Sequence, residues 1–229
     1  MRPTVLLFDI DGTLITTGGA GRRAMERAFA DAHGRADAVS FRLDGMTDRG
    51  IVRTALDNIG VESDERAIDA LLELYLVRLR EEVRLVPDAR YRVHAGMREA
   101  IAVARRHGAA VGLGTGNIRA GARIKLERVE LDSTFTFGGF GCDAESRAEL
   151  IRIGAERGAR ALGVSLTSCR VVVIGDTPKD VAAARAIGAE CIGVGTGHFS
   201  PQALIDSGAT SAFADLSAPG AIDALLEGT

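Results

Sequence analysis

The most informative stretch of the chain is Asp9-Ile10-Asp11-Gly12-Thr13-Leu14, which follows the apolar run Thr4–Phe8. Short, continuous apolar runs of this kind are typical of parallel strands buried on both faces. Side chains two residues apart in an extended chain point the same way, so Asp9 and Asp11 can address one site. Catalytic groups of open α/β sheets lie at such strand ends, although Asp-Gly is also a common turn pair.

Two neighbouring carboxylates repel each other, so the pair either shares a proton or needs a cation nearby. Mg²⁺ meets this need because it prefers oxygen ligands. A calcium-binding loop is excluded by spacing, since Gly12 comes two positions too early and Ala20 stands where the loop requires Glu. The stretch therefore favours a magnesium site over a calcium loop.

A second acidic strand end repeats this pattern further along the chain. Val171–Ile174 is another apolar run, and Asp176 follows it after Gly175. Asp180 comes four residues later, one helical turn away and within reach of the same space. A favourable charge at a helix N-terminus is the alternative interpretation of Asp180, but it explains Asp176 less well.

A third strand end carries glycine and hydroxyl groups in place of carboxylates. It reads Gly112-Leu113-Gly114-Thr115-Gly116-Asn117. Glycines allow backbone N–H groups to approach a phosphate closely, and Thr115 adds a hydroxyl donor. Thr115, Gly116 and Asn117 are therefore candidate phosphate-binding residues, with an ordinary tight turn as the alternative.

Strand and helix patterns alternate from about Asp88 to the C-terminus. The predicted strands are 109–113, 170–174, 190–194 and, more weakly, 134–137 and 211–214, with helices at 97–107, 147–162 and 178–187. Such alternation implies right-handed crossovers and an α/β fold with a doubly wound parallel sheet. Residues 16–87 break it with three helical patterns, so we expect an α/β core domain over 1–15 and 88–229 and an inserted helical cap domain over 16–87.

Composition narrows the possible partners. The 229 residues carry a formal net charge of -3, which argues against nucleic acid because binding a polyanion requires a basic face. No apolar run approaches the ~20 residues of a membrane span, and the N-terminus does not resemble a signal peptide. Three cysteines without a C-x-x-C pair suggest buried free thiols in a reducing compartment, so we expect a cytoplasmic protein. No extended heptad indicates an oligomeric state.

The three strand ends, in this order, resemble the haloacid dehalogenase superfamily. Asp9-x-Asp11-Gly12-Thr13-Leu14 resembles its first motif, Thr115 its second, and Gly175-Asp176-Thr177-Pro178-x-x-Asp180 its fourth. The resemblance implies a core with strand order 3-2-1-4-5. The helical block resembles the inserted C1 cap of the branch that contains phosphoglycolate phosphatase-like and β-phosphoglucomutase-like proteins.

The resemblance also implies roles for these residues. Asp9 would attack phosphorus to form an aspartyl-phosphate, and Asp11 would protonate the leaving oxygen and later activate water. Mg²⁺ would be held by Asp9, the backbone carbonyl of Asp11 and Asp176, with Asp180 close by. Thr115 would hydrogen-bond the transferring phosphoryl group.

The third motif of the superfamily is usually a lysine, and two residues compete for its role. Arg147 begins the predicted helix before the Asp176 strand, and Lys125 lies on the helix after Thr115. We favour Arg147 for its position, with a solvated basic side chain as the alternative for either. The carboxylate of Asp11 favours phosphoryl chemistry over dehalogenation, because a halide leaving group needs no proton.

The loop Asp44–Gly50 of the cap block is the candidate for substrate selection. Polar loops around glycine often face a closing site, so Thr47, Asp48 and Arg49 are candidate substrate contacts. Arg49 would meet an anionic substrate tail; alternatively, Thr47 is a helix N-cap and Arg49 is solvated. The sequence thus favours a Mg²⁺-dependent phosphomonoesterase for small phosphorylated metabolites. A sugar phosphomutase and a non-enzymatic metal- or phosphate-binding module are the alternatives.

Overall fold

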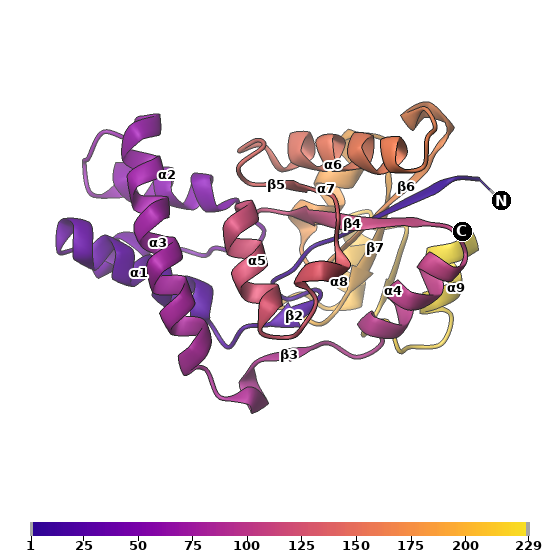
Figure 1. Cartoon of the computed structure of the whole chain (residues 1–229), viewed down its shortest axis with the longest axis horizontal. Coiled ribbons are helices and arrows are strands. Elements are labelled where there is room, and N and C mark those ends of the chain that lie inside the picture. The colour runs from indigo at the N-terminus through magenta and orange to yellow at the C-terminus, as the bar shows by residue number, and fades with distance from the viewer. Residues whose placement is uncertain (1, 228–229) are drawn as a thin grey trace.

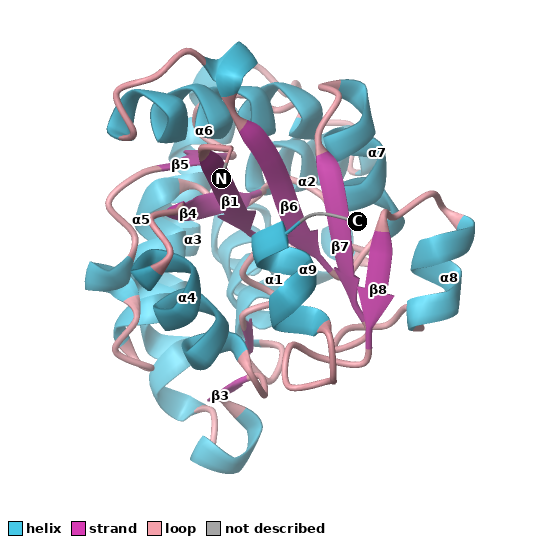
Figure 2. Cartoon of the chain, turned by 90° about the vertical axis from the view of Figure 1, so that its right-hand side faces the viewer, coloured by secondary structure: helices cyan, strands magenta, loops and turns pink. Residues whose placement is uncertain are grey.

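The computed structural model describes residues 2–227, and its centre is a six-stranded parallel sheet (Figures 1 and 2). The strands are β1 (Thr4–Phe8), β4 (Ala110–Thr115), β5 (Gly138–Phe140), β6 (Arg170–Gly175), β7 (Glu190–Val194) and β8 (Ser211–Phe213). They lie in the order β5-β4-β1-β6-β7-β8. Counted along the chain, this is the expected 3-2-1-4-5 order with a sixth strand added at one edge, so the predicted fold class is confirmed.

Helices cover both faces of the sheet, as the apolar strands require. Val5 and Leu7 of β1 point to one face, where α6 (Arg147–Ala161), α7 (Pro178–Ala186) and α8 (Pro201–Asp206) pack. Leu6 and Phe8 point to the other face. There they meet α4 (Met97–Arg106), α5 (Arg119–Glu127) and α9 (Ala221–Glu227). Because these strands are parallel, the carboxyl ends of β1, β4 and β6 lie side by side along one edge of the sheet, the edge formed by the strand ends.

Residues 16–87, which we call the cap segment, are mainly helical and lie beyond that edge (Figure 1). The segment contains α1 (Ala20–His33), the 3-10 helix η1 (Ala36–Val39), α2 (Asp48–Asn58) and α3 (Glu65–Leu85). Its interior is continuous with the α4, α5 and α9 face of the sheet. The division of the chain into two domains stays a prediction, and residues 1, 228 and 229 of the predicted core domain lie outside the described residues.

A short antiparallel pair joins the two connections between the cap segment and the sheet. It consists of β2 (Ile15–Thr16) and β3 (Arg92–Val93), which follows the 3-10 helix η2 (Asp88–Arg90). Neither strand was expected, because two residues are too few to produce an alternating pattern. The pairing holds the incoming and outgoing chains side by side.

Two further expectations were wrong in detail. The strand expected at 134–137 lies at 138–140, and a 3-10 helix, η3 (Asp132–Thr134), precedes it. Cys142 is exposed, whereas Cys169 and Cys191 are buried as expected. Within residues 2–227, no helix combines the length and the apolar character that a membrane span requires.

Candidate active site

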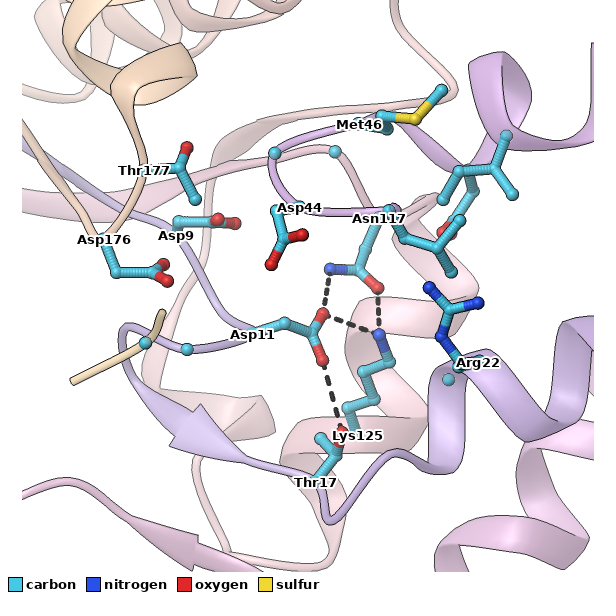
Figure 3. A pocket seen from close by; sticks show the side chains of 18 of the residues that line it. Asp9, Asp11, Thr17, Arg22, Asp44, Met46, Asn117, Lys125, Asp176 and Thr177 are labelled. Carbon is cyan, nitrogen blue, oxygen red and sulfur yellow. Dashed lines mark hydrogen bonds and ion pairs between the residues drawn. The ribbon is translucent and has the colours of Figure 1, made fainter. Parts of the chain in front are cut away.

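A cavity of ≈ 390 Å³ lies where the carboxyl ends of β1, β4 and β6 face the cap segment (Figure 3). Its walls include the strand-end residues Asp9, Asp11, Asn117 and Asp176, together with Lys125 and Arg147. Cap residues close the opposite side, among them Arg22, Met25, Leu43, Asp44, Met46, Asp48, Ile51 and Tyr75. Residues far apart in sequence therefore share one chamber, as the positions of the three strand ends predict.

Three buried carboxylates form an acidic centre at the wall of this chamber, and two of them, Asp9 and Asp176, line the chamber itself. Oxygens of Asp9, Asp176 and Asp180 lie within 4.8 Å of one another, and each residue is at most 5% exposed. Asp9 is fixed at the end of β1 because its amide donates to the carbonyl of Ile174 at 2.9 Å. The parallel register of β1 and β6 therefore brings the first and second acidic strand ends together.

Asp180 owes its position to the start of α7. Pro178 occupies the first turn, and Thr177 forms a capping box with Asp180. Asp180 Oδ2 accepts from the Thr177 amide at 3.0 Å and from its hydroxyl at 2.7 Å. Asp180 is therefore both the helix-terminal charge that was the alternative interpretation and a member of the acidic centre.

Arg147 is the cation of the acidic centre. Its Nη2 donates to Asp9 Oδ2 at 2.7 Å, and its Nε donates to Asp180 Oδ1 at 2.9 Å. The side chain of Arg147 is 9% exposed, and those of Asp9 and Asp180 are 8% and 0% exposed. Of the two competing cations, Arg147 rather than Lys125 lies beside Asp9. The assignment of Arg147 to the third-motif role stays a prediction.

One guanidinium does not balance three buried carboxylates. Burial raises the pKa of Asp9, and Arg147 opposes this only in part. Burial, followed by the charges of Asp180 and Asp9, raises the pKa of Asp176 to about 8. The raised pKa values mean that the acidic centre retains a proton unless a further cation is present to let all three carboxylates ionise.

The donor set fits a divalent cation that prefers oxygen. The Thr13 hydroxyl donates to Oδ1 of Asp176 at 2.8 Å, so Thr13 does not occupy the other carboxylate oxygen, Oδ2. Backbone crowds Asp176, since a Cβ on Gly12 would lie 2.4 Å from Oδ2 and one on Gly197 would lie 1.8 Å away. Because only glycine permits this approach, both residues shape the space around Asp176.

Asp11 lies apart from this centre, beside Lys125 and Asn117 (Figure 3). Its Oδ2 accepts from Lys125 Nζ at 2.6 Å and from Asn117 Nδ2 at 2.8 Å. Burial raises the pKa of Asp11, but the Lys125 charge and the hydrogen bonds outweigh it, so the pKa lies below its usual value. Burial lowers the pKa of Lys125, and the Asp11 charge reverses this, so Lys125 stays charged.

The loop after β4 lies between Asp9 and the cap segment. Thr115 is fully buried, and its Oγ1 accepts from the Asn117 amide at 3.3 Å and from Asn117 Nδ2 at 2.9 Å. The Gly116 carbonyl accepts from the Asp48 amide at 2.8 Å. A Cβ on Gly116 would lie 2.2 Å from the Met46 carbonyl, so the cap loop sits directly against this loop.

The three cap residues predicted as substrate contacts have different surroundings. Thr47 caps α2 by accepting from the Gly50 amide at 3.1 Å. Asp48 lines the cavity, accepts from the Ile118 amide at 2.8 Å, and has its pKa raised by burial to about 6. Arg49 is turned toward Asp69, at 2.6 Å, and Glu65. The geometry therefore brings Asp48 to the chamber and directs Arg49 along the surface of the cap segment.

Two basic residues of the chamber, Arg22 and His198, are not among the predicted site residues. Arg22 lines the cavity while donating to the carbonyls of Val39 and Phe41, each at 2.8 Å. Asp44 of the cap loop lies 2.6 Å from His198 Nδ1. His198 lines the cavity shortly after β7, and such a position behind a strand end is the sequence signal that could have identified it.

Comparisons with known proteins agree with this architecture. A family model described as haloacid dehalogenase-like hydrolase matches residues 6–185. A hydrolase from Pseudomonas syringae has a TM-score of 0.70 at 21% identity, covering 98% of this chain and 97% of that chain. CbbY from Rhodobacter sphaeroides, in complex with phosphate, also has a TM-score of 0.70, at 17% identity, covering 97% and 100%.

A predicted phosphoglycolate phosphatase from Haemophilus somnus has a TM-score of 0.66 at 15% identity, covering 95% of this chain and 96% of that chain. At such identities, the likeness to solved structures establishes a shared fold along nearly the whole length. A comparison with curated proteins found no match.

Proposed function

The chain belongs to the haloacid dehalogenase-like hydrolase family, and we propose that it is a Mg²⁺-dependent phosphohydrolase of small phosphate monoesters. The observation that carries the proposal is the convergence of Asp9, Asp176 and Asp180 within 4.8 Å of one another, with Asp9 and Asp176 lining the chamber. Arg147 bridges two of them. Phosphoryl transfer requires mainly positioning and neutralisation of charge, and this arrangement supplies both.

Asp9 is the proposed nucleophile. One of its oxygens forms a bond to phosphorus while the bond from phosphorus to the leaving oxygen breaks, which gives an aspartyl-phosphate. Arg147 holds Asp9 Oδ2 at 2.7 Å and thereby leaves Oδ1 for the attack. Thr115, Gly116 and Asn117 lie at the adjoining strand end, where they can orient the phosphoryl oxygens.

Asp11 is the proposed acid and base. Its protonated form, which the low pKa of Asp11 makes the minor one in the free protein, gives a proton to the leaving oxygen in the first step. Asp11 takes a proton from the water that attacks the aspartyl-phosphate in the second step, which restores that form. The second step releases inorganic phosphate and regenerates the Asp9 carboxylate. Asp11 lies on the same strand end as Asp9 and lines the same cavity.

Asp9 and Asp176 are the proposed ligands of Mg²⁺, with the backbone carbonyl of Asp11 implied by the family resemblance. Asp180 is fully buried, and its two oxygens already accept from Arg147 and Thr177. We therefore assign Asp180 to holding Arg147 beside the ion. Mg²⁺, when bound, supplies positive charge that stabilises the phosphoryl oxygens.

The proposed substrates are small because the chamber is small. Its ≈ 390 Å³ lies near the lower end of the range for ligand pockets, and it must hold the phosphoryl group as well as the leaving group. The cap side presents the apolar side chains of Met25, Leu43, Met46 and Ile51. A compact phosphorylated metabolite fits such a chamber better than a polymer.

Phosphate release from 4-nitrophenyl phosphate tests the proposal. We expect turnover with Mg²⁺, none after chelation, and a loss of at least about 1,000-fold in kcat for Asp9→Asn. Asp206→Asn is the matched control, because Asp206 is exposed on α8 and bonds only to Gln202 among the described side-chain contacts. An Asp9→Asn protein that folds and turns over as fast as the control would refute the covalent mechanism. A phosphomutase would instead isomerise sugar phosphates without net phosphate release.

A further inference from the structure

One oxygen of Asp11 is saturated, and the other is open. Oδ2 accepts from Lys125 Nζ at 2.6 Å and from Asn117 Nδ2 at 2.8 Å, which fills both of its lone-pair directions. Within residues 2–227, Oδ1 accepts only from the Thr17 hydroxyl, at 3.5 Å. The side chain of Asp11 is 41% exposed toward the cavity, so Oδ1 is the oxygen that a substrate can reach.

Lys125 is itself held rigidly. Its ammonium also donates to Asn117 Oδ1 at 2.6 Å, so two of its three donors hold Asp11 and Asn117. The Tyr75 hydroxyl lies close to it, since both groups lie within 4 Å of a Cβ on Gly21. The backbone carbonyl of Lys125 accepts from the Tyr91 hydroxyl at 2.8 Å. The side chain is 4% exposed, and a Cβ on Gly21 would lie only 3.2 Å from Nζ.

These contacts connect three parts of the fold. Tyr75 belongs to α3 of the cap segment, Lys125 to α5, and Asp11 to the end of β1. A buried cation that donates to both Asp11 and Asn117, and that lies beside a buried tyrosine of the cap segment, has little freedom to bind a phosphoryl group. Lys125 therefore serves a different purpose from Arg147, which contacts Asp9 directly.

We propose that Lys125 is a positioning residue that fixes Asp11 so that Oδ1 alone transfers the proton. The inference rests on the proposed function and assigns its acid–base step to one atom. The Oδ1–H bond breaks as the proton passes to the leaving oxygen, and a new Oδ1–H bond forms when Asp11 takes a proton from the attacking water. Asn117 supports the same orientation from the loop after β4.

The dependence of rate on the leaving group tests this role. The probes are 4-nitrophenyl phosphate, whose leaving group departs without a proton, and benzyl phosphate, whose alkoxide needs one. The ratio of their kcat/KM values reports the step in which the leaving group departs. Lys125→Met should lower kcat/KM for benzyl phosphate at least about tenfold more than for 4-nitrophenyl phosphate, in the same direction as Asp11→Asn.

Arg123→Met is the matched control, because Arg123 lies on α5, is 73% exposed and pairs with Glu127. It should leave the ratio of the two kcat/KM values unchanged. Asn117→Ala removes one donor to Asp11 without deleting a buried charge, so it carries the test if Lys125→Met fails to fold. A folded Lys125→Met or Asn117→Ala protein that loses activity equally on both probes overturns the inference. Absence of turnover by the unmodified protein overturns the proposed function and this inference with it.

Discussion

Arg147→Met should destabilise the chain strongly in the absence of divalent cations. Arg147 is 9% exposed and is the cation in contact with Asp9 and Asp180, whose side chains are 8% and 0% exposed. Removing one partner of a buried ion pair typically costs about 3–5 kcal/mol, because the remaining charge stays buried and unpaired. For a domain of this size, the loss corresponds to a fall in Tm of roughly 10 °C.

The destabilisation should shrink when Mg²⁺ is added. A cation bound between Asp9 and Asp176 restores part of the missing positive charge, and ligand that binds the native state alone stabilises it by mass action. The assay is urea unfolding of the purified protein at pH 7.5, first with EDTA and then with excess Mg²⁺. Each variant is compared with the unmodified chain under the same conditions.

Arg152→Met provides the matched control for this experiment. Arg152 lies on the same helix, is 44% exposed, and pairs with Glu149 and Glu156, which are also exposed. Exposed ion pairs contribute little to stability, so this variant should unfold near the unmodified protein, and Mg²⁺ should not change the difference. Equal destabilisation by the two substitutions, or a loss in Arg147→Met that Mg²⁺ leaves untouched, would refute the charge-balance reasoning.

Two other substitutions probe the cap contact and the metal site. Asp48→Asn should stabilise the protein above pH 6 by up to about 3 kcal/mol. The pKa of Asp48 is about 6 in the folded protein and 3.8 in the unfolded chain. The unmodified protein therefore loses stability as the pH rises from about 4 to above 6, and the Asn variant does not. Urea unfolding at pH 4 and pH 7.5 checks this, and a difference that does not change with pH would exclude it. Gly197→Ala should weaken Mg²⁺ binding about 10–100-fold, since its Cβ would lie 1.8 Å from Asp176 Oδ2. Gly121→Ala, whose Cβ meets only ordinary contacts from 3.6 Å, is the control for calorimetric titration with Mg²⁺, and equal affinities in both variants would argue against a site at Asp176.

Local sequence signals were enough to predict the elements that carry the acidic centre. The apolar runs before Asp9 and Asp176 mark two buried strands, and the helix predicted from residue 178 is α7, which begins at Pro178. Each signal lies within a few residues of the feature it predicts. Once β1 and β6 pair in parallel, their carboxyl ends, and with them Asp9 and Asp176, lie next to each other.

Features that depend on contacts between distant segments could not be predicted in this way. The strand β5 begins with Gly138 and Gly139, which have low strand propensity. A Cβ on Gly139 would lie 1.7 Å from the Leu150 carbonyl, so the close approach of α6 explains the glycine. This requirement becomes visible only when the helix is in place.

The carboxylates that the basic candidate residues contact could not be predicted from the sequence either. Lys125 reaches Asp11 because α5 packs beside the end of β1, over a separation of 114 residues. Arg49 pairs with Asp69 and Glu65 because α2 and α3 lie side by side in the cap segment. A basic residue near a motif therefore indicated that a charge was available, but the tertiary structure determined which carboxylate it met.

Calorimetric titration of Mg²⁺ into the metal-free protein tests whether Asp9 and Asp176 bind the same ion. The unmodified chain should bind one Mg²⁺, and Asp9→Ala and Asp176→Ala should each abolish that binding, while Asp206→Ala retains it. If either substitution at the acidic centre leaves the affinity and the stoichiometry unchanged, the two strand ends do not share an ion, and the phosphohydrolase mechanism proposed for this chain is wrong.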